Sequence, residues 1–224
     1  MCPKQRIALY GGTFDPVHLG HLEIARKVCE LFEIEKVVFI PAQVAPHKLD
    51  SSVTPPVHRY AMLALATQSD PQLLISTFEI EAPNRRFTVD TLAYFVGRWG
   101  ATSELFFVMG ADSWSEITTW REWQRLLGMV NHIVVARPGH NLSGPEAVSD
   151  RVVDLRSHPL TTDQLKAVSE NRIYLTDVVF TDVSSTMIRS CVREGRVEEL
   201  TRFVSEPVAQ YILKYRIYRE SNEV

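Results

Sequence analysis

Short apolar runs alternate with longer stretches of mixed polarity along most of the chain. The runs predict strands at Ile7–Tyr10, Val37–Ile40, Leu73–Ile75, Leu105–Met109, Ile133–Ala136 and Ile173–Leu175. Most of these runs are continuously apolar rather than alternating between apolar and polar residues. That pattern is typical of a parallel sheet covered by helices on both faces.

The longer stretches carry helical periodicity. In Leu19–Phe32, apolar residues recur at spacings of three and four and share one predicted face: Leu22, Ala25, Cys29 and Phe32. Pro56–Thr67 and Thr88–Trp99 have similar lengths, and Thr88 is interpreted as an N-cap. The repeated strand–helix–strand order predicts right-handed crossovers and an α/β fold with a doubly wound, mostly parallel sheet, a Rossmann-like arrangement.

The last third of the chain is less regular. Loop-forming residues dominate Gly139–Glu170, where Thr161-x-x-Gln164 is interpreted as a capping box that opens a short helix. A final helix is predicted from near Ser205 to Tyr218, with one face formed by Val208, Tyr211, Tyr215 and Tyr218. Because no repeat or linker divides the sequence, we expect a single domain, 1–224, with residues 184–224 as a small C-terminal helical subdomain.

Composition narrows the classes of function. The 224 residues are 45% hydrophobic, enough for a core that needs no disulfide or metal, and the net charge of −3 argues against a protein that coats nucleic acid. Cys2, Cys29 and Cys191 are odd in number and far apart, which argues against a disulfide framework. No apolar stretch approaches the roughly 20 residues of a membrane span, and no signal peptide is visible. We therefore expect a cytoplasmic protein with no membrane or nucleic-acid partner.

The most informative segment, Gly11–His21, reads G-G-T-F-D-P-V-H-L-G-H. It joins the first predicted strand to the first predicted helix, at the edge where open α/β sheets bind ligands. Gly11 and Gly12 let the backbone approach a phosphate, and the helix start offers free N–H groups. His18 and His21 lie three residues apart, so both side chains can reach one anion.

Other interpretations of this loop are weaker. It is neither G-x-x-x-x-G-K-[ST] nor G-x-G-x-x-G, so a Walker-type NTPase and a dinucleotide dehydrogenase lack their fingerprints. His-x-x-His has no neighbouring Cys, Asp or Glu at the spacing of a zinc site. The glycines and histidines alone are equally explained by a tight turn with two capping histidines, whereas the full run is far more specific.

That full run, G-G-T-F-D-P-x-H-x-G-H, resembles the signature of the H-x-G-H nucleotidyltransferases, which are related in fold to class I aminoacyl-tRNA synthetases. Thr181–Arg189 resembles the second motif of these enzymes, I-S-S-T-x-I-R, with Val183 at the Ile position. Ser184 and Ser185 alone could be a plain N-cap, and Arg189 alone a solvated helix residue. The two motifs together favour a second anion cradle.

Further stretches resemble the bacterial nicotinate-mononucleotide adenylyltransferases. Pro41–Lys48 is similar to their P-x-x-x-P-P-H-K, with Ala45 in place of one proline. Phe87–Leu92 is similar to their Y-T-x-D-T-L, with Phe87 in place of Tyr. Gly110–Asp112 and Arg137–Gly139 match G-A-D and R-P-G. Trp120 follows the G-A-D element at the spacing expected for the family. The resemblance covers roughly the whole chain, except for Gly139–Glu170.

The resemblance implies adenylyl transfer. The phosphate of nicotinate mononucleotide would attack the α-phosphorus of ATP, giving nicotinate adenine dinucleotide and pyrophosphate in NAD biosynthesis. The attacking phosphate is already an anion, so the reaction needs alignment and charge neutralisation rather than a general base. Mg²⁺ would be held by the ATP phosphates, without protein ligands.

The resemblance also implies residue roles. The catalytic residues would be His18, His21, Lys48 and Arg189. The ATP site would add Gly11, Gly12, Thr13, Phe14, Ser184 and Ser185. The acceptor site would contain Thr88, Asp112, Trp120 and Arg137. Three of these have plain structural alternatives: an N-cap for Asp112, a core position for Trp120 and a surface ion pair for Arg137.

Competing functions remain open at this point. A phosphopantetheine adenylyltransferase or a cytidylyltransferase would share the first motif, but not P-H-K, T-x-D-T-L and R-P-G together. An enzyme that uses nicotinamide mononucleotide would keep every motif. A non-catalytic nucleotide-binding regulator is disfavoured by the intact His18, His21, Ser184, Ser185 and Arg189. The sequence leaves a homo-oligomer open.

Overall fold

The computed structural model describes residues 4–43, 53–82, 87–136, 145–157, 170–177 and 183–219. Their helices and strands are, in chain order, β1 (Gln5–Gly12), α1 (Leu19–Phe32), β2 (Lys36–Pro41), α2 (Pro56–Thr67), β3 (Leu73–Ile75), α3 (Thr88–Trp99), β4 (Ser103–Gly110), α4 (Ala111–Ser115), η1 (Ile117–Thr119), α5 (Trp123–Met129), β5 (Asn131–Val135), η2 (Glu146–Arg151), β6 (Val152–Asp154), β7 (Ile173–Thr176), α7 (Ser185–Arg193), η3 (Val197–Arg202) and α8 (Glu206–Lys214).

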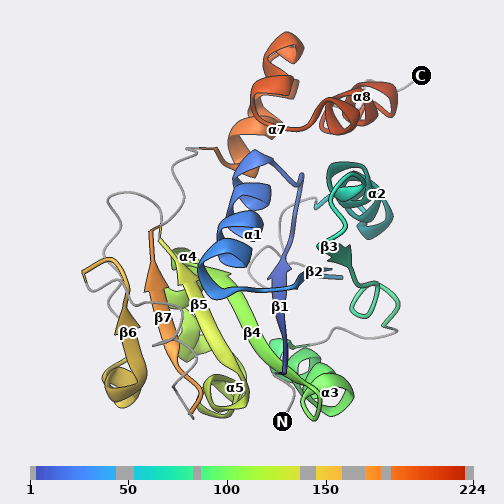
Figure 1. Cartoon of the computed structure of the whole chain (residues 1–224). Helices are drawn as coiled ribbons and strands as arrows, with labels where there is room; N and C mark the ends of the chain where they lie inside the picture. The colour runs from blue at the N-terminus through green and yellow to red at the C-terminus, as the bar shows by residue number, and fades with distance from the viewer. Residues whose placement is uncertain are drawn as a thin grey trace.

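A seven-stranded sheet lies at the centre of the molecule, in the order β3-β2-β1-β4-β5-β7-β6, and every neighbouring pair is parallel (Figure 1). The chain moves outward from β1 through β2 to β3, then returns to β4 beside β1 and proceeds the other way. The switch point therefore lies at the carboxyl ends of β1 and β4. The predicted doubly wound α/β sheet is confirmed, with the short edge strand β6 added.

Each face of the sheet carries its own layer of core side chains. In β1, Ala8 and Tyr10 pack with α1, α2, α7 and α8, whereas Ile7 and Leu9 pack with α3, α4 and α5. Both sides of the strands are therefore buried, which explains why the apolar runs in the sequence are continuous.

The helices α1, α2 and α3 have the predicted bounds, with two differences in detail. In α1, Val28 is fully buried, whereas the predicted Cys29 is only partly buried. Apolar residues follow Ala25 at both i+3 (Val28) and i+4 (Cys29), and the sheet covers Val28. In α3, Phe87 is the N-cap and Thr88 is the first helical residue. The capping box predicted at Thr161 lies outside the described residues.

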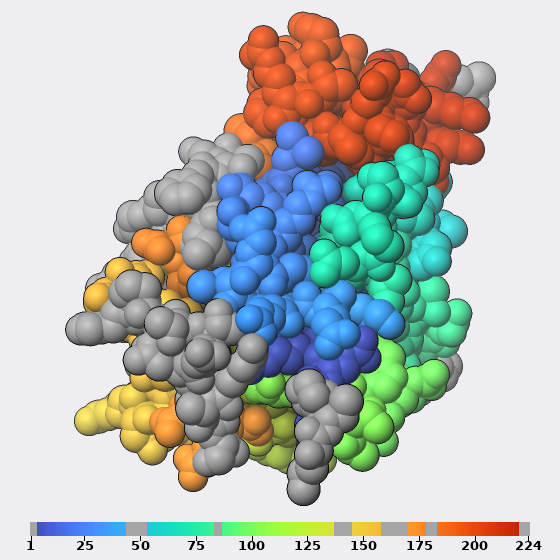
Figure 2. All heavy atoms as spheres, viewed as in Figure 1, coloured from blue at the N-terminus to red at the C-terminus, as the bar shows by residue number. Residues whose placement is uncertain are grey.

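The C-terminal helices α7 and α8 form a cap beyond the carboxyl end of β1, and α8 packs on α2 (Figures 1 and 2). The last helix is shorter than predicted, since it ends at Lys214 and a turn follows. Its buried face is therefore formed by Val208, Ala209 and Ile212, while Tyr215 is 51% exposed. None of the helices in the described part of the chain has the length and apolar character that crossing a membrane requires.

Candidate active site

The signature loop leaves β1 through two glycines and turns sharply at Phe14. A Cβ at Gly12 would lie 2.8 Å from Cζ of Phe14, so only glycine fits there. Phe14 has a φ of 51° and buries its ring against Tyr10, Phe39 and His21. The Phe14 side chain therefore belongs to the core, and Phe14 can contribute to a nucleotide site only through its backbone.

The two histidines lie at the start of α1, where His18 is the N-cap. Their rings stack with centroids 3.7 Å apart, and Nδ1 of His21 accepts a hydrogen bond from the His18 backbone N–H at 3.2 Å. This bond assigns the proton of a neutral His21 to Nε2, where it can be donated to an anion. A Cβ at Gly20 would lie 3.1 Å from Cγ1 of Val183 and 3.2 Å from Nδ1 of His18, which explains the glycine between the histidines.

The second motif packs directly on the first. Ser184 is the N-cap of α7, and its Oγ accepts from the Met187 N–H at 3.2 Å. Ser185 Oγ donates to the Pro16 carbonyl at 3.0 Å, and Arg189 Nη1 donates to the Asp15 carbonyl at 2.7 Å. Residues about 170 positions apart are thereby brought together, as the resemblance predicted. The N-cap interpretation of Ser184 is also confirmed and does not exclude an anion site at the same helix start.

Asp15 connects three parts of the chain at this point. Its side chain is buried and accepts from the Tyr218 hydroxyl at 2.7 Å and from the Thr54 N–H at 3.2 Å, and its peptide bond to Pro16 is cis. Burial, and then the Asp15 carboxylate, raise the pKa of Tyr218 far above its ordinary value. Sequence reasoning missed Tyr218 because its partner lies 203 residues away.

Arg59 is a second residue that sequence reasoning missed. It is fully buried, and its guanidinium donates to four backbone carbonyls, those of Thr13 at 2.7 Å, Ala42 at 2.6 Å, Gln43 at 3.3 Å and Thr54 at 2.9 Å. Burial lowers its pKa, but an arginine stays charged in a protein. One signal in the sequence could have indicated Arg59: within α2 it is the one residue among Lys, Arg, Asp and Glu.

A cavity of about 260 Å³ opens at the carboxyl ends of β1 and β4, at the topological switch point. Five residues predicted for the site line it: Gly11, Gly12, Thr13, Thr88 and Trp120. Trp120 also packs against the layer of α3 and α5, so its core position is confirmed, while its role in acceptor binding stays a prediction. Sequence reasoning missed several other lining residues, among them Glu79, Phe87, Thr91, Met109, Ser113 and Arg121.

Other predicted residues are not among those that line this cavity. Asp112 is exposed in the first turn of α4, and its neighbour Ser113 lines the cavity instead. Lys48 and Arg137 lie outside the described residues. Within the described ranges, no group of three or more His, Cys, Asp or Glu side chains could hold a metal ion.

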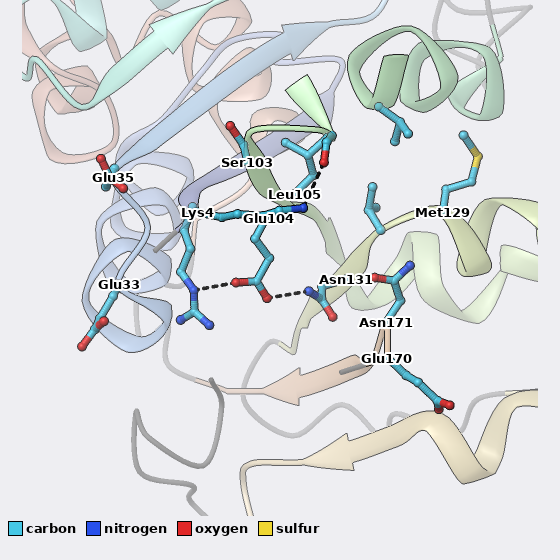
Figure 3. A pocket seen from close by; sticks show the side chains of 14 residues that line it. Lys4, Glu33, Glu35, Ser103, Glu104, Leu105, Met129, Asn131, Glu170 and Asn171 are labelled. Atoms are coloured by element: carbon cyan, nitrogen blue, oxygen red, sulfur yellow. Dashed lines mark hydrogen bonds and ion pairs between the residues drawn. The ribbon is translucent and has the colours of Figure 1, made fainter. Parts of the chain in front are cut away.

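A larger hollow of about 830 Å³ lies at the opposite, amino edge of the sheet (Figure 3). There the Glu104 carboxylate accepts from Arg6 at 2.8 Å and from Asn131 at 3.1 Å. Neither motif reaches this edge, and ligands of doubly wound sheets bind at the carboxyl ends of the strands. The cavity beside Gly11 and Gly12 is therefore the candidate active site.

Comparison with known proteins identifies the family of the chain. Residues 9–191 match the cytidylyltransferase-like family model. A protein of Thermoanaerobacter sp. named "Probable nicotinate-nucleotide adenylyltransferase" is 36% identical over 97% of this chain and 96% of its own. One of Corynebacterium jeikeium with the same name is 34% identical over 94% of this chain and 99% of its own.

Solved structures show the same fold. The nicotinic acid mononucleotide adenylyltransferase of Plasmodium falciparum, complexed with NaAD, matches with a TM-score of 0.71 at 19% identity, over 96% of this chain and 97% of that one. The structural match shows the fold alone, whereas the family model and the full-length relatives also show the family. The chain belongs to the cytidylyltransferase-like family and, within it, to the nicotinate-nucleotide adenylyltransferases.

Proposed function

We propose that this protein joins ATP and nicotinate mononucleotide to give nicotinate adenine dinucleotide and pyrophosphate, a step of NAD biosynthesis. One observation carries the proposal: the Gly11–His21 and Ser184–Arg189 motifs pack on each other, and Gly11, Gly12 and Thr13 of the first motif line a cavity at the switch point of the sheet. The names of the full-length relatives support the choice of both substrates.

The chemistry matches the side chains present. A phosphate oxygen of the acceptor forms a bond to the α-phosphorus of ATP, and the bond from that phosphorus to the bridging oxygen breaks as pyrophosphate leaves. No proton has to be removed from the attacking anion. The protein therefore contributes alignment and positive charge, which stabilise the developing charge on the α-phosphate and the leaving group.

On the ATP side, His18 and His21 lie at the start of α1 and hold the triphosphate, with His18 nearest the reacting phosphorus. Lys48 and Arg189 add positive charge, and the starts of α1 and α7 add the positive ends of two helix dipoles. The remaining ATP contacts come from the hydroxyls of Ser184 and Ser185 and from the backbone of Gly11, Gly12, Thr13 and Phe14.

On the acceptor side, Trp120 provides a flat wall for the pyridine ring. Thr88 is the first residue of α3, where the N–H groups of the helix start would bind the carboxylate of the nicotinate ring. Asp112 accepts from a ribose hydroxyl, and Arg137 neutralises the acceptor phosphate. These two assignments rest on the resemblance of G-A-D and R-P-G to the family.

Mg²⁺ would be held by the ATP phosphates, without protein ligands, and would partly neutralise their charge. We place the enzyme in the cytoplasm, with small-molecule substrates and no nucleic-acid or membrane partner. Light scattering of the purified protein would show whether it forms a homo-oligomer.

The decisive experiment measures pyrophosphate release with ATP and Mg²⁺, using nicotinate mononucleotide, nicotinamide mononucleotide or phosphopantetheine as acceptor. We expect a strong preference for nicotinate mononucleotide. His18→Ala should lower kcat about 10²–10³-fold, because it removes a donor that acts in the transition state.

The control is His58→Ala, since the His58 ring contacts the Tyr211 hydroxyl at 2.9 Å rather than the site. This variant should keep near-normal turnover. Activity near that of the native enzyme in His18→Ala would contradict the role of His18. ATP binding without turnover of any acceptor would favour a nucleotide-binding regulator.

A further inference from the structure

Among the described residues that line the active-site cavity, Arg121 is the one that carries a positive charge. It follows η1 and precedes α5, and its side chain is 55% exposed. The same described lining includes one carboxylate, that of Glu79. A ligand with a carboxylate therefore meets attraction from one of these side chains and repulsion from the other.

Arg121 is held at a defined place on the cavity wall. Its Cζ lies 4.9 Å from the centroid of the Phe87 ring, and Phe87 is the N-cap of α3. Thr88 and Val89, the first two residues of α3, both line the cavity. The backbone N–H groups of a first helical turn have no partner within the helix. The guanidinium thus lies beside the positive end of a twelve-residue helix.

The acidic groups nearby leave Arg121 able to act on a ligand. Glu122 Oε1 lies 3.6 Å from Arg121 Nε, but its Oε2 lies 2.7 Å from Arg125 Nη1. The hydrogen bond from Arg125 is the main reason that the pKa of Glu122 is lowered. Glu79 accepts from Thr91 Oγ1 at 2.7 Å, which holds the repelling carboxylate in the cavity wall.

We propose that Arg121 is a specificity-determining residue, which selects an acceptor with a carboxylate on its pyridine ring over one with an amide. The inference rests on the proposed function and deepens it. The guanidinium offers a fork of donors that matches a carboxylate, and an uncharged amide gains much less from it. Stacking on Phe87 restricts the guanidinium before the ligand arrives, which lowers the entropy cost of binding.

The experiment compares kcat/KM for nicotinate mononucleotide with kcat/KM for nicotinamide mononucleotide in four proteins. In Arg121→Gln, the ratio of the two should fall about tenfold, because one charge-assisted contact to the carboxylate is lost. Arg121→Lys keeps the positive charge but loses the planar fork of donors. Its ratio of kcat/KM values should lie between that of the native enzyme and that of Arg121→Gln. Arg98→Gln is the matched control, since Arg98 is an exposed arginine at the far end of α3 whose Nη1 contacts the Tyr94 hydroxyl. Its ratio should equal that of the native enzyme.

Ionic strength provides a second readout that a merely structural role would not change. The Arg121 side chain is half exposed, so added salt should weaken its preference for the carboxylate. The ratio should fall with salt in the native enzyme and stay flat in Arg121→Gln. Thermal melting of each variant checks that the fold is kept.

Three outcomes would overturn the inference. The ratio could be unchanged in Arg121→Gln, or fall equally in Arg98→Gln. Both kcat/KM values could fall together in Arg121→Gln, which would place Arg121 on the phosphate that the two acceptors share. A native enzyme inactive with both acceptors would instead refute the proposed function itself.

Discussion

At the scale of single residues, Arg59 shows how a side chain outside the motifs can organise the site. Its guanidinium binds carbonyls in the signature loop (Thr13), after β2 (Ala42, Gln43) and before α2 (Thr54). Buried carbonyls need partners, and one planar fork supplies them to three segments at once. Residues 44–52, which contain Lys48, connect two of these segments in the sequence. We therefore predict that Arg59 acts as a positioning residue.

We predict that Arg59→Lys lowers the free energy of unfolding by about 2–4 kcal/mol, because an ammonium group cannot replace all four contacts. It should also lower kcat/KM for ATP about tenfold, since the signature loop, which we propose to bind the phosphates, loses its alignment. Urea unfolding and steady-state kinetics measure the two effects.

The control for Arg59→Lys is Arg6→Lys. Arg6 is also buried and binds Glu104 and the Phe32 carbonyl, but it lies at the amino edge of the sheet. This variant should lose stability without loss of kcat/KM for ATP. Both variants are assayed at a temperature where they are folded. If kcat/KM for ATP fell equally in Arg59→Lys and Arg6→Lys, Arg59 would have no specific role in positioning the signature loop.

At the scale of elements, the turn after α8 closes the molecule onto its own signature loop. Tyr218 donates to Asp15, whose backbone carbonyl accepts from Arg189 of α7. The Leu19 N–H at the start of α1 donates to the Phe203 carbonyl, after η3, at 2.8 Å. The C-terminal cap therefore fixes the start of α1 from two sides.

We predict that Tyr218→Phe lowers the free energy of unfolding by about 1–3 kcal/mol, because it removes a donor to the buried Asp15 carboxylate. The variant should also change the pH dependence. The pKa of Tyr218 is raised in the folded state, so its stabilising contribution is full below about pH 10 and is lost as the pH rises above that value.

The measurement is urea unfolding at a series of pH values from neutral to alkaline. The difference in unfolding free energy between the native protein and Tyr218→Phe should shrink by about 1.4 kcal/mol per pH unit above pH 10. A difference that stays constant with pH would refute the role of the hydroxyl.

At the scale of the whole molecule, the C-terminal helices share a core layer with the sheet. Ile212 of α8 is fully buried in the layer that contains Tyr10 and Phe106, whereas Trp114 is buried in the layer on the other face. The interpretation of the chain as one domain stays a prediction, and these two layers provide its test.

We predict that Ile212→Ala lowers the free energy of unfolding by about 2–5 kcal/mol, the usual cost of such a cavity. If the chain unfolds as one unit, tryptophan fluorescence and far-UV circular dichroism should report the same shifted midpoint. All four tryptophans lie between Trp99 and Trp123, far from α8 in sequence. A shift in circular dichroism alone would show that the C-terminal helices unfold separately.

The sequence alone determined the parallel sheet, six of its seven strands (β1–β5 and β7) and the bounds of α1, α2 and α3, because continuous apolar runs and helical periodicity are local signals. It also determined the two motifs, since their glycines, histidines and serines are adjacent in the chain. Two details were not predictable: the end of the last helix at Lys214, and the burial of Val28 rather than Cys29 on α1. Packing against neighbouring elements decides both.

Only the tertiary structure decided what surrounds the motifs. Tyr218 binds Asp15 across 203 residues, and Arg59 gathers carbonyls from three segments, so no local pattern could indicate either contact. Arg121 is an ordinary surface arginine in the sequence and becomes part of the cavity only because α3 and the loop before α5 meet at the switch point. Local spacing determines which elements form, whereas the contacts that build the cavity depend on how the chain is wound.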